Sequence, residues 1–407
     1  MISEKKKYER SVKLYPWYYG LSADLILYVA INTIWLIEVK GYSDVQMNLL
    51  SSVASLTALA LIYPMLRLTK KIGNVVSMRI GAFCLFLSSL IFTFSNSYLI
   101  FVIGELFYEL SFLFAMMSII VIKNNLEKLG REGEFVKVRS DGSLIYAILT
   151  AIATLCCGYL FNFHKFLPMI LGTVLCLVCF FISLFIVDVD NVKKEEVQTE
   201  KKNKSFMRDQ FKIIIAVILY YGLAFSIIAF SQQNGKLLIQ NTLLEGFSVE
   251  KTAIYLSYVM FISRIVRILG NMAFPLVYRK LGNKTGILVS FMIFLSCLII
   301  LVGAFIKADI YLRAIIISFG FSFIPLLRDP LRIISQNLIF EKIDKKYHED
   351  ALAYLTLGRN IFKFAISLVV SAFLLNFSVG HLFIMLVLFS LPVFVIIFKI
   401  IGVKGDV

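Results

Sequence analysis

The sequence has little charge for its length. Only 16% of its 407 residues are charged, although the net charge is +15, whereas 59% are apolar or aromatic and the mean hydropathy is +0.85. Soluble domains carry about a quarter charged residues. This chain cannot cover itself with a water-facing shell, which excludes an ordinary soluble protein.

Residues that commonly build metal centres, disulfide frameworks and phosphate loops are scarce or badly placed. None of the three histidines, His164, His348 and His381, falls in the middle of a long apolar run, so we expect no histidine-built metal site. All six cysteines lie within apolar runs, where they act as small apolar fillers. The chain has no G-x-x-x-x-G-K-[ST] loop and no legible nucleophile–base pair. We therefore expect no cofactor, no ATP drive and no enzyme.

Long apolar runs are what the sequence does contain. A helix needs about 20 apolar residues to cross a membrane, and backbone groups in lipid must be satisfied within the helix. The first run is too long for a cleaved signal peptide, so we expect it to be retained. The sequence predicts an all-α membrane protein with twelve spans, near 14–38, 46–68, 75–94, 99–122, 143–163, 166–188, 212–231, 252–277, 286–305, 311–335, 351–375 and 381–402.

The positive charges predict the topology. With both termini in the cytoplasm, most Lys and Arg residues fall in inner segments, and six fall outside: Lys40, Lys165, Lys236, Lys251, Lys307 and Arg313. This is the positive-inside pattern. The cations are spread over short loops instead of forming one basic domain, so we expect the lipid bilayer as partner and no nucleic acid. We expect a monomer in the cytoplasmic membrane.

A long charged stretch, residues 188–212, separates six spans from six. It predicts a six-helix bundle over 1–188, a cytoplasmic linker over 189–211 and a second six-helix bundle over 212–407. A solvated loop is the simpler interpretation of the linker, and a docking role is the alternative.

The two halves share sequence motifs. Residues 18–21 and 220–223 are both Tyr-Tyr-Gly-Leu. After the second span, residues 70–74 are Lys-Lys-Ile-Gly-Asn, and after the eighth, residues 279–283 are Arg-Lys-Leu-Gly-Asn. Two matches in the same order at equivalent places predict an internal duplication.

Over essentially its whole length the sequence resembles the major facilitator superfamily. That family carries a loop motif, approximately G-x-x-x-D-R-x-G-R-K, after its second span and a weaker copy after its eighth. The matching residues here are Lys71, Gly73, Lys280 and Gly282. The family's leading glycine and its aspartate are replaced by Leu66 and Lys70, then by Pro275 and Arg279. The family's cytoplasmic charge latch therefore does not carry over, whereas the glycines can still make tight turns.

The first span holds an acid among polar and aromatic residues. On one helix, Asp24 would share a face with Trp17, Tyr28, Asn32 and Trp35. The resemblance implies that spans 1, 4, 7 and 10 line a central cavity. Asp24 would then take up a proton or face the substrate, and a structural hydrogen bond to a neighbouring helix is the alternative.

The fourth span holds two acids one turn apart, Glu105 and Glu109, beside Tyr108 and Phe112. Two carboxylates this close in a poorly hydrated cavity do not both ionise easily, so one proton is held more tightly. They are candidates for proton coupling, with an ion pair as the alternative.

The second half holds the cations of the spans. Arg264 and Arg267 lie in span eight, and Arg359 and Lys363 in span eleven. The resemblance places spans 2, 5, 8 and 11 between the halves, which favours gate or inter-half ion pairs. Guanidinium groups also suit carboxylates and phosphates, so binding of an anionic substrate is the alternative.

Two further polar clusters interrupt spans. Arg328, Asp329 and Arg332 stand near two prolines in span ten, which favours a local ion pair. Residues 231–234, Ser-Gln-Gln-Asn, would lie at the outer end of span seven, as part of an outer gate or as the start of a loop.

The resemblance implies a secondary active transporter that moves a small solute by alternating access. Proton coupling through Asp24, Glu105 and Glu109 is the expected energy source. An acid among aromatic residues favours multidrug-type efflux, and the mid-span cations favour an anionic or zwitterionic metabolite. A membrane sensor or partner subunit on the same fold is the alternative from another class.

Overall fold

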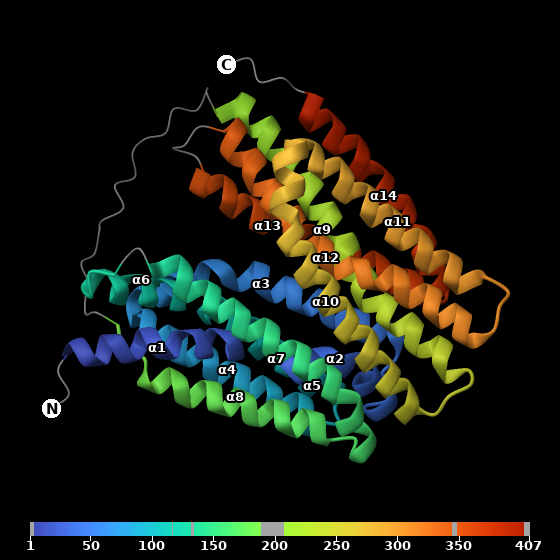
Figure 1. Ribbon diagram of the computed structural model, residues 1–407, viewed down its shortest axis with the longest axis horizontal. Coiled ribbons are helices and arrows are strands. Elements are labelled where there is room, and N and C mark those ends of the chain that lie inside the picture. The colour runs from blue at the N-terminus through green and yellow to red at the C-terminus, as the bar shows by residue number, and fades with distance from the viewer. Residues whose placement is uncertain (1–3, 116, 132–133, 189–206, 344–347, 403–407) are drawn as a thin grey trace. The chain divides into compact units, whose positions relative to one another are not determined.

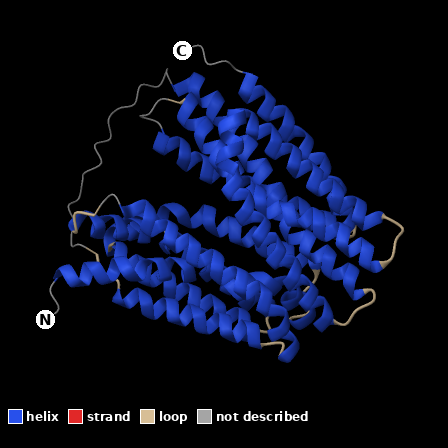
Figure 2. Cartoon of the chain, in the orientation of Figure 1, coloured by secondary structure: helices blue, strands red, loops and turns tan. Residues whose placement is uncertain are grey.

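The computed structural model describes residues 4–115, 117–131, 134–188, 207–343 and 348–402. These residues form fourteen α-helices, one π-helical segment and one 3-10 turn, with no strand among them (Figures 1 and 2). In chain order they are α1 Glu4–Ser22, α2 Ile26–Ile34, η1 Trp35–Val39, α3 Asp44–Ile72, α4 Asn74–Phe94, α5 Tyr98–Ala115, α6 Ser118–Lys128, α7 Phe135–Phe163, α8 Leu167–Phe185, α9 Met207–Leu244, α10 Val249–Leu281, η3 Gly282–Lys284, α11 Thr285–Phe305, α12 Ile310–Lys342, α13 His348–Leu374 and α14 Val379–Gly402.

Ten stretches of the described residues are long and apolar enough to cross a membrane. One of them, Val249–Phe305, contains both α10 and α11, and α3 is a further helix of 29 residues. The all-α membrane fold is confirmed, while the count of twelve spans and the sidedness of the termini stay predictions. Most of the predicted linker lies outside the described residues.

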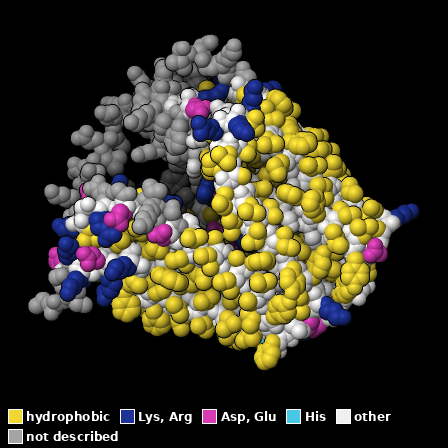
Figure 3. Space-filling model, viewed as in Figure 1, with side chains coloured by type: hydrophobic (Ala, Val, Ile, Leu, Met, Phe, Trp, Pro, Cys, Tyr) yellow, Lys and Arg dark blue, Asp and Glu magenta, His cyan; other side chains and the backbone are white. Residues whose placement is uncertain are grey.

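The exterior of the helices is apolar, as lipid contact requires. Leu99, Phe163 and Met272 expose 75%, 85% and 71% of their surface, and many other large apolar side chains are also exposed. In Figure 3 hydrophobic side chains cover the outward faces of the helices, whereas Lys, Arg, Asp and Glu gather at helix ends.

The chain divides into two compact units. The first comprises Met1–Tyr42 and Leu56–Val197, where α1 packs against α7 and α8, and α4 packs against α5 and α8. The second comprises Ser43–Ser55 and Gln198–Val407, where α9 packs against α12, α13 and α14, and α12 packs against α10 and α11. The continuous helix α3 thus begins in the second unit and ends in the first, which a division into consecutive halves does not anticipate.

Several predicted spans differ from the observed helices, and the first and the seventh differ at polar residues. The first span is interrupted between Ser22 and Ile26, and its last turn is the π-helical η1. The seventh span was expected to end near residue 231, but α9 continues to Leu244. Residues 231–234 therefore lie inside a helix, and their interpretation as the start of a loop is wrong. An apolar run ends at the first polar cluster. The helix itself continues when these polar side chains find hydrogen-bond partners on a neighbouring helix.

The repeated Tyr-Tyr-Gly-Leu motif makes the same contact in each unit. Tyr18 is fully buried, and its hydroxyl donates to the backbone carbonyl of Met78 in α4 at 3.3 Å. Tyr220 is fully buried, and its hydroxyl donates to the carbonyl of Gly286 in α11 at 3.2 Å. Both acceptors lie near the start of the helix that follows the repeated Gly-Asn loop. In each unit one hydrogen bond thus joins the tyrosine motif to the helix that follows the Gly-Asn loop.

The glycines of the same motif allow close helix packing. A Cβ atom added to Gly20 would lie 2.5 Å from Cγ2 of Ile145 in α7. A Cβ atom added to Gly222 would lie 2.5 Å from Cδ2 of Phe362 in α13. Neither position has room for a side chain, so glycine sets the approach of α1 to α7 and of α9 to α13.

Candidate functional site

A break in the first span carries Asp24. The backbone is not helical between α1 and α2, so helical hydrogen bonds are lost there. The partly buried Asp24 side chain replaces one of the lost acceptors. Its Oδ1 accepts a hydrogen bond from the backbone N–H of Leu25 at 2.8 Å and another from the hydroxyl of Tyr108 in α5. Irregular backbone at membrane depth is tolerated where it is enclosed by protein or lines a cavity. A carboxylate beside the first turn of α2 also faces the positive end of that helix.

Aromatic rings surround this acid in the first unit. The ring of Phe92 lies 5.0 Å from that of Tyr28 and 6.2 Å from that of Tyr108, and Tyr108 contacts Phe112 at 4.8 Å. Tyr28, Tyr108 and Phe112 were expected at the site. Phe92 in α4 was not expected at the site. It contacts three aromatic rings from other helices, and an apolar run does not indicate which of its phenylalanines will do so.

Glu105 and Glu109 belong to the same neighbourhood. Both are partly buried on α5, and both carboxylates lie within electrostatic range of the Tyr108 hydroxyl. Glu105 also acts on the hydroxyl of Tyr28. The structure thus brings the three acids predicted from sequence around one tyrosine. Their role in proton coupling stays a prediction.

The other residues of the expected stripe lie in different surroundings. Trp35 is fully buried, its Nε1 donates to the carbonyl of Phe92 at 3.0 Å, and its ring packs edge-on against Phe166. Trp17 exposes 52% of its surface, and Asn32 is partly buried. The stripe assumed one uninterrupted helix from Trp17 to Trp35, and the break at Asp24 removes that assumption. A cavity role for these three residues stays a prediction.

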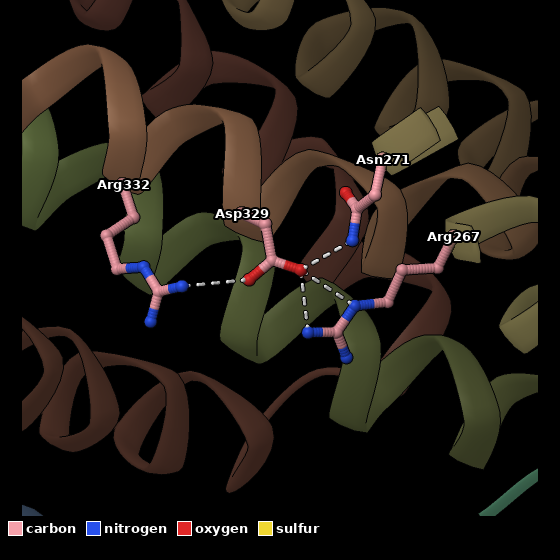
Figure 4. A network of polar contacts seen from close by, with 4 residues as sticks. All are labelled: Arg267, Asn271, Asp329 and Arg332. Carbon is pink, nitrogen blue, oxygen red and sulfur yellow. Dashed lines mark hydrogen bonds and ion pairs between the residues drawn. The ribbon is translucent and has the colours of Figure 1, made fainter. Parts of the chain in front are cut away.

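A charged network lies in the second unit around Asp329 of α12 (Figure 4). Oδ2 of Asp329 accepts from Nη2 of Arg267 at 2.8 Å, from Nε of Arg267 at 3.0 Å and from Nδ2 of Asn271 at 3.0 Å. Nη2 of Arg332 approaches Oδ1 at 3.6 Å. The predicted local pair of Asp329 with Arg332 is present. Arg267 has an acidic partner inside its own unit, and its role in a gate or an inter-half ion pair stays a prediction.

A second group of cations surrounds Phe225 of α9. The guanidinium carbon of Arg328 lies 5.3 Å from the centroid of this ring, and that of Arg359 lies 5.1 Å from it. Phe225 is 7% exposed. Arg264 is 7% exposed on α10, and its Nε finds no hydrogen-bond acceptor among the described residues. Lys363 is partly buried on α13, one turn after Arg359.

The polar residues of 231–234 meet the first turns of α3 within the second unit. Asn48 and Asn234 are fully buried and exchange two amide hydrogen bonds, each of 3.1 Å. The hydroxyl of Ser51 donates to Gln233 at 2.7 Å. These bonds explain why α9 remains helical past residue 231. Their service as an outer gate stays a prediction.

The glycines of the loop motif adopt the expected left-handed backbone. Gly73 has φ +86° and Gly282 has φ +54°, and each begins the turn into the next helix. Lys71 and Lys280 are exposed at the preceding helix ends. In the second copy the amide of Asn283 donates to Glu341 of α12 at 2.5 Å. Glu341 was not expected from the loop motif, because it comes from a helix distant in sequence.

Comparisons with known proteins agree with this architecture. The family model for the Major Facilitator Superfamily matches residues 19–367. The solved structure of the nucleoside transporter NupG is 11% identical, with a TM-score of 0.71, covering 98% of this chain and 100% of that one. That of a D-xylose-proton symporter is 13% identical, with a TM-score of 0.68, covering 97% of each chain. No curated protein sequence matches the chain. The chain therefore belongs to the Major Facilitator Superfamily and is a multi-pass membrane transporter, not an enzyme.

Proposed function

We propose that the protein is a proton-coupled secondary carrier of a small solute in the cytoplasmic membrane, with Asp24 as its principal proton site. The observation that carries this proposal is the position of Asp24 at a helix break, where Tyr108 donates to its carboxylate. Discontinuous helices at membrane depth commonly form the ion and substrate sites of secondary carriers.

The hydrogen bonds of Asp24 explain how a proton would act on the helices. The charged carboxylate accepts from both Leu25 and Tyr108, and so ties the first turn of α2 to α5. Protonation removes the charge and weakens both bonds, because a neutral carboxyl group is a poorer acceptor. A proton would thereby shift the balance between two arrangements of these helices.

Glu105 and Glu109 support the same proposal. Both acids act electrostatically on the Tyr108 hydroxyl that donates to Asp24. We infer that they adjust proton binding at Asp24 and offer a second position for the proton.

Two observations bear on the solute and the direction of transport. The rings of Tyr28, Phe92, Tyr108 and Phe112 around Asp24 favour the export of aromatic compounds, as in multidrug-type efflux. The guanidinium groups of the second unit favour an anionic or zwitterionic solute instead. The structural neighbours, a nucleoside transporter and a D-xylose-proton symporter, add polar solutes to the candidates and support proton use.

Everted membrane vesicles test the proposal. A proton gradient is established and reported by a pH-sensitive dye, and uridine, D-xylose, ethidium and inorganic phosphate are added in turn. We expect at least one solute to collapse the gradient in vesicles with the protein and not in vesicles without it. We expect Asp24→Asn to abolish that collapse while counterflow exchange of the same solute continues.

The matched control is Asp141→Asn, which removes an exposed carboxylate from the same unit. It should behave as the unchanged protein does. If Asp24→Asn retains full coupling, Asp24 is not the proton site. If no solute of a broad panel disturbs the gradient, the sensor or partner-subunit interpretation replaces the carrier.

A further inference from the structure

The exposed face of α1 carries a narrow row of residues, which we call the α1 row: Lys6, Arg10, Lys13 and Trp17. All four are exposed, and successive members are three or four residues apart, so they follow one side of the helix. Between residues 8 and 22 the exposed residues of α1 are Arg10, Lys13 and Trp17. Three cations therefore precede one tryptophan along a single helix face.

The opposite face of α1 is fixed in the core of the first unit. Val12 and Tyr15 pack in a buried cluster with Leu126 of α6. The hydroxyl oxygen of Ser11 accepts a hydrogen bond at 3.0 Å from the backbone N–H of Val187, just beyond the end of α8. These contacts hold α1 in one rotation, so the α1 row must face the surroundings of the unit.

The α1 row lies beside the end of an apolar helix. α8 ends at the exposed Phe185, and the guanidinium carbon of Arg10 lies 5.6 Å from the centroid of this ring. Arg79 of α4 fixes this end of α8, because it donates to the carbonyls of Leu184 and Ile186, each at 3.1 Å. Figure 3 shows Lys and Arg side chains, with some Asp and Glu, where α1 begins, beside the hydrophobic exterior of the unit. Arg10 is thus level with the edge of an apolar surface.

The residues of the α1 row suit a boundary between hydrocarbon and lipid headgroups. Trp17 follows Lys13 by about one turn, and tryptophan is enriched where its ring meets apolar groups and its N–H meets polar ones. Long Lys and Arg side chains lay their apolar stems along such a surface and extend their charges to the headgroups. α1 carries five Lys or Arg residues and two Glu residues, so cations prevail at this boundary.

We propose that the α1 row, with Phe185 beside it, binds the phosphate headgroups of anionic phospholipids. Lys and Arg clusters at the end of a membrane-spanning helix attract anionic lipid, and each cation contributes about fivefold to the affinity. The positive-inside pattern requires only that cations lie on one side of the membrane, in any loop. A row on one helix face, bordered by Trp17 and Phe185, contacts both the phosphate and the acyl chains. This lipid site is independent of the proton site and of the transported solute.

Quenching of Trp17 fluorescence tests the site. The chain has two tryptophans and Trp35 is fully buried, so the quenching that Trp17→Phe removes belongs to Trp17. The full-length protein is reconstituted in phosphatidylcholine vesicles with a minor fraction of brominated phosphatidylglycerol or, for comparison, of brominated phosphatidylcholine. We expect the brominated phosphatidylglycerol to quench Trp17 at least about threefold more strongly, and added salt to reduce this preference. Equal quenching by the two lipids, or quenching by neither, would overturn the proposal.

A triple variant assigns the lipid preference to the α1 row. Lys6→Gln, Arg10→Gln and Lys13→Gln together remove its cations and keep Trp17 as the reporter. We expect the ratio of quenching by the two brominated lipids to fall to near one. Elution volume and melting temperature establish that the variant is folded. An unchanged ratio in the folded variant would exclude the site.

The matched control removes three other exposed cations of the first unit. It combines Lys5→Gln, Lys7→Gln and Arg131→Gln, and so changes the net charge by the same amount. Lys5 and Lys7 flank the α1 row, and Arg131 pairs with Glu134 at 2.6 Å. The control should retain the lipid preference of the unchanged protein. An equal loss in the two triple variants would show that total charge alone attracts the lipid, against the proposal.

A soluble phosphate is the remaining competitor for the α1 row. Excess glycerol 3-phosphate, compared with sodium chloride at the same ionic strength, should leave the quenching by brominated phosphatidylglycerol unchanged. The lipid is retained by its acyl chains, which the soluble compound lacks. Displacement of the lipid by glycerol 3-phosphate would assign the α1 row to a soluble anion and refute the lipid site.

Discussion

The two units share their packing contacts and differ in their charges. In each unit the first tyrosine of the repeated motif donates to a backbone carbonyl, and the glycine of that motif admits a neighbouring helix. The first unit then carries carboxylates near the middle of its spans, and the second carries guanidinium groups. The comparison teaches that the two units share contacts to the backbone, which depend on how closely the helices pack. The charges at membrane depth differ between the units, and each depends on the partners that its own neighbouring helices supply.

The difference extends to the backbone. The first span breaks at Asp24, where a side chain satisfies the freed N–H of Leu25. The corresponding helix α9 continues without interruption, and Ser226 returns its hydroxyl to the carbonyl of Gly222 within the helix. A carboxylate can accept a hydrogen bond from a backbone N–H that has lost its helical acceptor. A serine hydroxyl instead donates to a backbone carbonyl of its own helix, and the helix continues.

The largest effect on stability is expected at the charge pair of the second unit. Asp329→Asn leaves Arg267 without its carboxylate in a partly buried position, and should lower the free energy of unfolding by about 3–4 kcal/mol. Thermal unfolding in detergent measures the change. Arg267→Gln combined with Asp329→Asn should cost less than the sum of the two single variants. Strict additivity would show that the pair contributes nothing, and the exposed control Asp309→Asn should be neutral.

A smaller effect, equal in the two units, is expected at the motif glycines. Gly20→Ala and Gly222→Ala each insert a methyl group where an atom already lies 2.5 Å away, which should cost about 1–3 kcal/mol through forced helix separation. The control is Gly172→Ala, where the nearest atom is 3.7 Å away and the change should be small. Melting temperatures of the purified variants decide the matter. A large loss in one unit only would break the structural equivalence.

The smallest effect is expected at the motif tyrosines. Tyr18→Phe and Tyr220→Phe each remove one hydrogen bond to a buried carbonyl and keep the ring, so each should cost about 1 kcal/mol. Thermal unfolding of the two single variants and the double variant measures the effects. They should be similar and additive, since the two bonds lie in different units. A change near zero in either would mean that the carbonyl finds another donor.

Much of the fold could be predicted from local sequence. Apolar runs of membrane length predicted helices. The repeated motifs predicted an internal duplication, and Tyr18 and Tyr220 of these motifs make equivalent contacts in the structure. The glycines at 73 and 282 were expected in tight turns and have positive φ. These predictions depend on hydrophobicity and on backbone conformation, and both are determined by the residues of a short segment.

The candidate site could be predicted only in part. The sequence indicated Asp24, Glu105 and Tyr108 because ionisable and polar groups in apolar runs are rare. It did not indicate Phe92 or Phe225, since an aromatic ring in an apolar run looks like any other core residue. Hydropathy averaged over a window of residues does not show the break at Asp24. The same average predicted too early an end for α9, because it cannot show that Asn48 of another helix satisfies Asn234.

The sequence by itself determined that this chain crosses a membrane as helices. It also predicted two related halves, with most acids of the spans in the first and most cations in the second. Lipid enforces the helical crossing, because every apolar run must find hydrocarbon and every backbone group a partner. Only the tertiary structure decided which partner each charged side chain contacts. Asp24 accepts from Tyr108, Arg267 pairs with Asp329, and two arginines lie against one phenylalanine ring. Those partners come from separate helices, and helix packing, which no local pattern records, selects them.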